Sequence, residues 1–66
     1  MATTGEKVRR LRRGSAMTQE QLAKAAGVSP STIVAIERGE RPTPHPATLG
    51  KLAKALGVSP ADLLED

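Results

Sequence analysis

The fold of this 66-residue chain is most evident in residues 18–38, TQEQLAKAAGVSPSTIVAIER. Thr18 is a typical helix N-cap, and Gln21 follows at the spacing of a capping box. Gly27 stands where a left-handed residue can end a helix, and Pro30 occupies a first-turn position at which its missing N–H costs nothing. These signals predict two helices joined by a tight corner, over residues 18–26 and 30–38.

Similar signals mark three further helices outside this stretch. Thr3 and Glu6 have capping-box spacing, and Gly14 is expected to end the helix that they begin. Prolines occupy three of the five positions from 42 to 46 and favour an irregular loop before the next helix. The predicted additional helices cover residues 3–13, 46–56 and 60–64. No strand-like alternation appears, so we expect an all-α bundle of five helices forming one domain over residues 1–66.

One nine-residue segment occurs twice. Leu22–Pro30 recurs as Leu52–Pro60 with a single difference. We interpret both copies as the same solution to a tight helix–glycine–helix corner. The first copy continues into a helix with Arg38 and Arg41 at its end, whereas the second is followed by acidic residues that would repel phosphate. Only the first corner therefore suits DNA.

The composition excludes several classes of function. The absence of cysteine rules out disulfides and thiolate metal sites and agrees with a cytoplasmic location. No apolar run approaches the roughly 18 residues that span a bilayer, and Met1-Ala-Thr-Thr lacks the apolar stretch of a signal peptide. A single histidine and scattered acids provide no metal cluster or nucleophile–base pair, so we expect no cofactor, no small-molecule ligand and no enzymatic activity.

Charge and aromatic content favour duplex DNA as the partner. The net charge is +3, and residues 1–45 hold eight Lys/Arg against four Asp/Glu while residues 46–66 hold two against three. The N-terminal part is therefore the candidate for meeting phosphate. The lack of Phe, Tyr and Trp argues against proteins that stack single-stranded bases on aromatic rings.

The helix over residues 30–38 has two contrasting faces when it is laid out at about 100° per residue. Ile33, Ile36 and Glu37 share the side expected to face the core. The opposite side is small, nearly uncharged and ends in an arginine, as suits a helix that enters a major groove about 12 Å wide. Its members are Ser31, Val34, Ala35 and Arg38.

The same layout predicts an ion pair between two helices. It turns Val8, Leu11 and Arg12 toward the core and leaves the three other arginines of residues 3–13 toward solvent. Arg12 is then a half-buried cation, and Glu37 is the one acid placed in a similar way. Because a half-buried charge is costly without a partner, we predict an Arg12–Glu37 ion pair with a mainly structural purpose.

The start of the helix over residues 18–26 is a candidate phosphate site. Its free N–H groups and positive dipole end could hold a backbone phosphate beside Thr18 and Gln19. The alternative is that Gln19 is an ordinary first-turn residue. The spacing alone leaves both interpretations open.

Taken together, four motifs resemble the Cro/repressor-type helix-turn-helix family, also called the xenobiotic-response-element family. They are Thr-Gln-x-x-Leu-Ala from residue 18, Gly-Val-Ser from 27, Ile-x-x-Ile-Glu-x-Gly from 33 and Leu-x-Lys-Leu-Ala from 49. The resemblance covers residues 8–64. It implies a lambda-repressor-like five-helix domain in which the second and third helices form the helix-turn-helix, and a dimer that binds a palindromic operator.

The resemblance also assigns residue roles. Gln19 matches a glutamine that touches phosphate and sometimes a base, and Arg12 and Glu37 match an ion pair found in family members. Pro30, Ser31 and Ala35 occupy the family's base-reading positions. His45 stands where some members place an arginine near the minor groove, although a lone histidine in a proline-rich loop is more often simply solvated.

The base-reading positions depart from members that use glutamine, because Pro30 and Ala35 donate no side-chain hydrogen bond. Direct readout would then depend on hydroxyls and on methyl contacts to thymine, with arginines at the groove edge. The predicted base contacts are Ser31, Thr32, Val34 and Ala35. The predicted phosphate contacts are Thr18, Gln19, Arg38 and Arg41.

We therefore expect a transcriptional regulator that binds double-stranded DNA in a sequence-specific manner, with repression favoured. The competing interpretation is a protein-interaction module of the same fold, such as an antitoxin-like or regulatory partner. A homodimer is a further hypothesis: Leu63 and Leu64 either leave an apolar patch for a second copy or close the core of the monomer.

Overall fold

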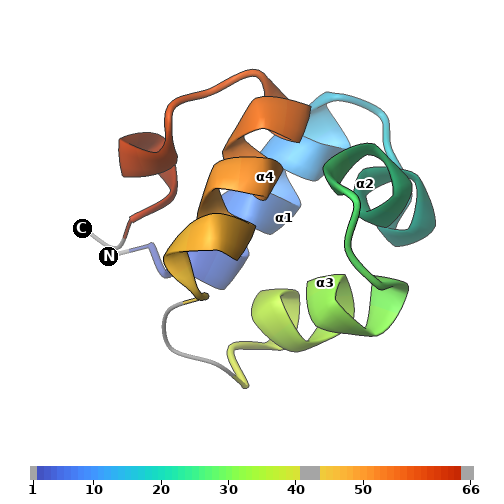
Figure 1. Ribbon diagram of the computed structural model, residues 1–66, viewed down its shortest axis with the longest axis horizontal. Coiled ribbons are helices and arrows are strands. Elements are labelled where there is room, and N and C mark those ends of the chain that lie inside the picture. The colour runs from blue at the N-terminus through green and yellow to red at the C-terminus, as the bar shows by residue number, and fades with distance from the viewer. Residues whose placement is uncertain (1, 41–43, 65–66) are drawn as a thin grey trace.

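The computed structural model describes residues 2–40 and 44–64, and within them every regular element is helical (Figure 1). Four α-helices are followed by one 3-10 helix. They are α1 (Thr4–Gly14), α2 (Gln19–Ala26), α3 (Pro30–Arg38), α4 (Pro46–Leu56) and η1 (Pro60–Leu63). The all-α expectation is confirmed, and the four predicted α-helices begin and end within one residue of their observed bounds.

The expectation of five α-helices is wrong at the fifth element. Residues 60–63 form a 3-10 turn, in which Asp62 N–H donates to the Ser59 carbonyl at 3.0 Å and Leu64 N–H to the Ala61 carbonyl at 3.2 Å. Four residues closed by i→i−3 bonds are too short to establish an α-helical ladder. The turn nevertheless carries Leu63 into the core, where it is 0% exposed.

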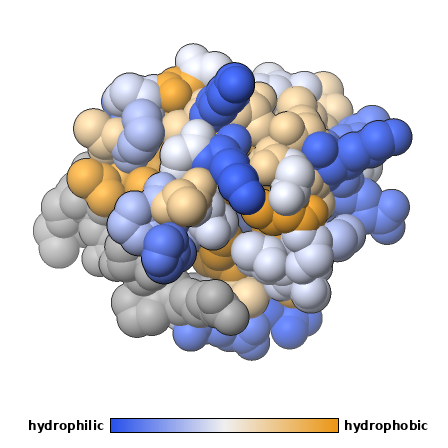
Figure 2. Space-filling model, viewed as in Figure 1, coloured by the Kyte–Doolittle hydropathy of each residue, from blue (hydrophilic) through white to orange (hydrophobic). Residues whose placement is uncertain are grey.

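The core is aliphatic and receives side chains from all five elements. Helix α2 packs on both α3 and α4. The corner between α2 and α3 lies on one side of the bundle (Figure 1). In the same view, apolar surface appears only in separate patches between hydrophilic side chains (Figure 2). The buried apolar residues are Val8, Leu22, Ala23, Ala26, Ile33, Ile36, Leu49, Leu52, Ala53 and Leu63.

The two copies of the repeat form the same corner. Gly27 and Gly57 have φ values of 71° and 72°, and the residue after each glycine donates its N–H to Ala23 or Ala53 at 3.0 Å. Only glycine adopts this left-handed backbone without strain. The first corner continues into the nine residues of α3, whereas the second continues into the short η1.

The end of α1 differs from the sequence prediction. Gly14 is still helical, and the left-handed residue that ends the helix is Ala16, with φ 56°. Met17 N–H then donates to the Arg12 carbonyl at 3.1 Å, the bond that closes a Schellman-type end. A glycine that could have ended the helix is therefore bypassed, and an alanine carries the backbone strain.

Helix α1 crosses α3 at Gly5. A Cβ atom on Gly5 would lie 2.2 Å from the Ile36 carbonyl oxygen and 3.3 Å from Glu37 Cα. No side chain other than hydrogen fits at this distance, because ordinary carbon–oxygen contacts begin near 3.3 Å. Gly5 therefore sets how closely the N-terminal turn of α1 approaches the backbone of α3.

Candidate nucleic-acid interface

The two faces of α3 are separated as the helical layout predicts. Ile33 and Ile36 are 0% and 1% exposed, and the Glu37 side chain is 5% exposed. On the other side, Ser31 and Arg38 are exposed, and three residues between them, Thr32, Val34 and Ala35, are partly exposed. This outer face of α3, formed by those five residues, is free of large side chains other than its terminal arginine.

The predicted ion pair between Arg12 and Glu37 is present. Arg12 Nε donates to Glu37 Oε2 at 2.7 Å, and a second guanidinium nitrogen donates to Oε1 at 3.0 Å. The remaining terminal nitrogen donates to the Met17 carbonyl at 2.8 Å. Hydrogen bonding to the carboxylate and its opposite charge raise the pKa of Arg12 above its ordinary value, although burial acts in the opposite direction. The pair joins α1 directly to α3.

Gln19 is partly committed inside the protein. Its side-chain amide donates to Glu37 Oε1 at 3.3 Å, so the first residue of α2 is held against α3. One amide hydrogen and the amide oxygen remain available to an external partner. This bond could not be predicted from the sequence, because it depends on how the start of α2 lies against the end of α3.

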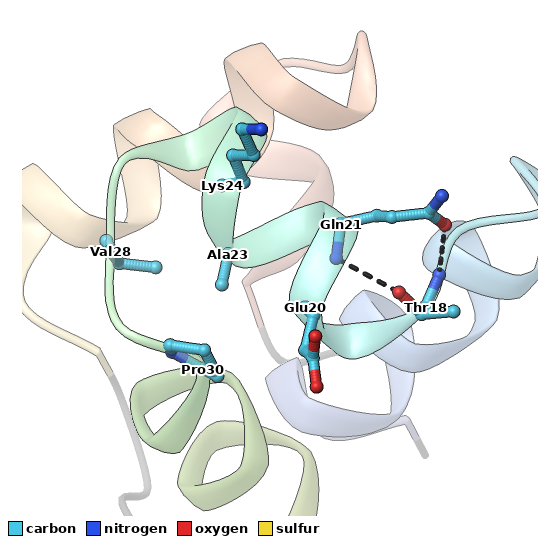
Figure 3. Close-up of a pocket in the computed structure, with 7 residues that line it drawn as sticks. All are labelled: Thr18, Glu20, Gln21, Ala23, Lys24, Val28 and Pro30. Atoms are coloured by element: carbon cyan, nitrogen blue, oxygen red, sulfur yellow. Dashed lines mark hydrogen bonds between the residues drawn. The ribbon is translucent and has the colours of Figure 1, made fainter.

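Thr18 caps α2 as its spacing predicts. Its hydroxyl accepts from Gln21 N–H at 3.0 Å, and its own N–H donates to the Gln21 side chain at 2.8 Å (Figure 3). Figure 3 shows this capping box at one edge of a shallow hollow between α2 and the start of α3, where Pro30 lies. The Thr18 hydroxyl proton remains free for a contact with phosphate.

Hydroxyl groups cluster at the start of α3, which the sequence analysis did not anticipate. The Ser29 hydroxyl accepts from Thr32 N–H at 3.3 Å and also shares hydrogen bonds with the hydroxyls of Ser31 at 3.0 Å and Thr32 at 2.9 Å. The available signal in the sequence was that Ser31 and Thr32 follow the cap Ser29 by two and three residues. Ser29 therefore orients both hydroxyls that were predicted to read bases.

Arg41 and His45 were also considered from the sequence. Arg41 lies outside the described residues. His45 is exposed and caps α4, where its ring Nδ1 accepts from Ala47 N–H at 3.3 Å.

Among the residues with assigned positions there is no group of three His, Cys, Asp or Glu side chains that could hold a metal ion. No helix in that part of the chain is long and apolar enough to cross a membrane.

The arrangement of α2 and α3 agrees with the known proteins that the chain matches. The profile of a helix-turn-helix family covers residues 8–63. The chain belongs to the Cro/repressor-type helix-turn-helix family. The resemblance drawn from the four sequence motifs is therefore confirmed.

Relatives in this helix-turn-helix family include two proteins of Bacillus subtilis (strain 168). The uncharacterized HTH-type transcriptional regulator RghRB is 49% identical over 53 residues, and the HTH-type transcriptional repressor RghR is 47% identical over 53 residues. Each match covers 80% of this chain but only 38% and 39% of the relatives' own length. The chain thus spans less than half of either relative.

A solved structure in the same family has nearly the same fold. The P22 c2 repressor protein in complex with the synthetic operator 9T superposes with a TM-score of 0.90 at 37% sequence identity. The superposition covers 98% of this chain and 97% of that chain. The helical arrangement of this protein is therefore that of a repressor DNA-binding domain.

Proposed function

We propose that this chain is a sequence-specific, double-stranded DNA-binding domain of a transcriptional repressor. The observation that carries the proposal is the uncrowded outer face of α3, whose opposite side is fixed in the core by Ile33 and Ile36. A helix with small outward side chains can lie deep in a major groove. The similarity to RghR, a transcriptional repressor, and to the P22 c2 repressor in complex with a synthetic operator supports the same function.

The contacts divide into two groups. Ser31 and Thr32 supply hydroxyls to base edges, while Val34 and Ala35 supply methyl groups that can pack on thymine. Thr18, Gln19 and Arg38 hold the flanking phosphates, together with Arg41. In this proposal the chain acts as one domain, works in the cytoplasm, needs no cofactor and catalyses no reaction.

A symmetric dimer on a palindromic operator is part of the proposal. The two leucines considered from the sequence have different environments: Leu63 is 0% exposed, whereas Leu64 is the one exposed large hydrophobic residue in the part of the chain that the structure describes, at 48%. Leu64 is therefore the candidate contact with a second copy, and Leu63 closes the core of the monomer. Sedimentation of the chain with and without duplex DNA tests this, since a monomer under both conditions would contradict the dimer.

The decisive experiment follows backbone amide resonances during titration with random-sequence and then selected duplex oligonucleotides. We expect shifts at residues 18–19 and 29–38, and an observed binding constant that falls steeply with salt because phosphate contacts release counterions. Selection of bound sites from a random duplex pool would supply the operator. Resonances that stay unchanged with DNA at low ionic strength would contradict the proposal and favour a protein-interaction module instead.

A further inference from the structure

Four arginines converge on one recess beside the recognition helix α3. Arg9, Arg12 and Arg13 come from α1, and Arg38 comes from the last turn of α3. Gln19, at the start of α2, and Glu37 complete the wall. We call this hollow the arginine recess. Three helices that are separate in the sequence thus contribute to a single concave surface.

The recess carries a surplus of positive charge. Among the described residues that line it, Glu37 is the one acid, and Arg12 already neutralises that carboxylate through contacts of 2.7 and 3.0 Å. Arg9, Arg13 and Arg38 are exposed, and none of them forms an ion pair with any residue of 2–40 or 44–64. About three charges therefore face solvent around a floor of buried polar groups.

The geometry of α1 adds to this convergence. Arg9 and Arg13 are four residues apart, so they lie on the same face of the helix and can approach a single anion together. Guanidinium groups present paired N–H donors that match two oxygens of a phosphate group. The neighbouring Gln19 retains one amide hydrogen, because only a single bond to Glu37 is formed.

We propose that the arginine recess binds one phosphate group of the DNA backbone and that Arg9 and Arg13 are ligands of this phosphate. This inference rests on the proposed function. It adds two residues of α1 to the contacts inferred from α2 and α3, and it places them on the strand that passes the C-terminal end of α3. The buried Arg12–Glu37 pair holds α1 and α3 at a fixed spacing and so keeps the ligands of the recess in register.

Arg10 provides a matched control on the same helix. It is also an exposed arginine, and it lines a neighbouring hollow together with Glu6, Arg9 and Arg13. Unlike Arg9 and Arg13, it does not line the recess. We would compare Arg9→Gln, Arg13→Gln, the double variant and Arg10→Gln. Each variant changes only exposed side chains, so its thermal midpoint should stay close to that of the wild-type chain. Binding to one duplex is measured by fluorescence anisotropy between about 50 and 200 mM salt.

We expect Arg9→Gln and Arg13→Gln each to bind up to about tenfold more weakly and to lower the log–log salt slope by about 1, the effect of one lost phosphate contact. Because one phosphate is shared, the double variant should lose little more than either single variant. Arg10→Gln should keep the wild-type slope.

Equal effects of Arg10→Gln and Arg13→Gln would overturn the inference, since they would indicate general attraction rather than a site. Unchanged slopes in all variants would also overturn it while leaving the proposed function intact. Absence of binding by the wild-type chain would instead contradict the proposed function. Titration with inorganic phosphate alone tests whether the recess prefers a free anion; saturation below millimolar phosphate would also count against a DNA backbone site.

Discussion

The contact between α1 and α3 predicts a large effect of Gly5→Ala on stability. The added Cβ would lie 2.2 Å from the Ile36 carbonyl oxygen, about 1 Å inside ordinary contact. That oxygen belongs to the backbone of α3, so no side chain can rotate away and the helices must separate. Overpacking costs about 3 kcal/mol at its upper range, and the better helix propensity of alanine returns about 1 kcal/mol. The net loss is about 2 kcal/mol.

A loss of this size is readily measured in so small a protein. The total stability expected for 66 residues is about 3 to 10 kcal/mol, and each 1 kcal/mol shifts the midpoint by about 4 to 8 °C in domains of this length. Gly5→Ala should therefore lower the thermal midpoint by about 8 to 16 °C, as followed by circular dichroism. Gly50→Ala is the control, since its Cβ meets nothing within 4 Å and should raise the midpoint slightly. Equal midpoints for the two variants would refute the assigned role of Gly5.

Three further predictions concern individual side chains. Arg12→Ala leaves the Glu37 carboxylate buried without its cation and should cost about 3 to 5 kcal/mol in chemical denaturation, whereas Arg38→Ala should weaken DNA binding with the midpoint nearly unchanged; the reverse pattern would contradict this division. Thr4→Val removes a buried hydroxyl that has no hydrogen-bond partner among residues 2–40 and 44–64 and should leave stability unchanged or raise it by about 1 kcal/mol, so a clear loss would reveal a partner for that oxygen. Ala16→Gly relieves a left-handed alanine and should stabilise the chain by about 0.5 to 1 kcal/mol in urea unfolding; destabilisation would show that the greater freedom of glycine in the unfolded chain outweighs the strain.

The sequence predicts features that depend on a few adjacent residues. Caps such as Thr3 and Thr18 place the helix starts, and helical periodicity alone brings Arg12 and Glu37 to the same interior. Both kinds of signal are complete within one helix. They therefore survive whatever packing follows, and the predicted helix bounds and ion pair agree with the structure.

Features that depend on contacts between helices could not be predicted in the same way. The close approach at Gly5 and the Gln19–Glu37 bond exist only because α1, α2 and α3 take particular relative positions. The prediction that Gly14 ends the first helix was wrong for a related reason. Gly14 is a local stop signal, but the helix ends where the Met17 N–H bonds to the Arg12 carbonyl. The roles of the predicted DNA contacts stay predictions, because they depend on a partner molecule.

The fixed side of α3 explains why its other side can remain simple. Ile33 and Ile36 anchor it in the core, Glu37 joins it to α1, and the Ile36 carbonyl sits against Gly5. All of these contacts lie on the inner face, so the position of α3 in the bundle depends mainly on that side. In the proposed function, substitutions at the exposed positions of the outer face would change base contacts with a small effect on stability, whereas a change in the α1–α3 spacing would move the whole helix and every arginine beside it. In the proposed function, binding specificity and fold stability thus depend mainly on opposite faces of the same nine residues.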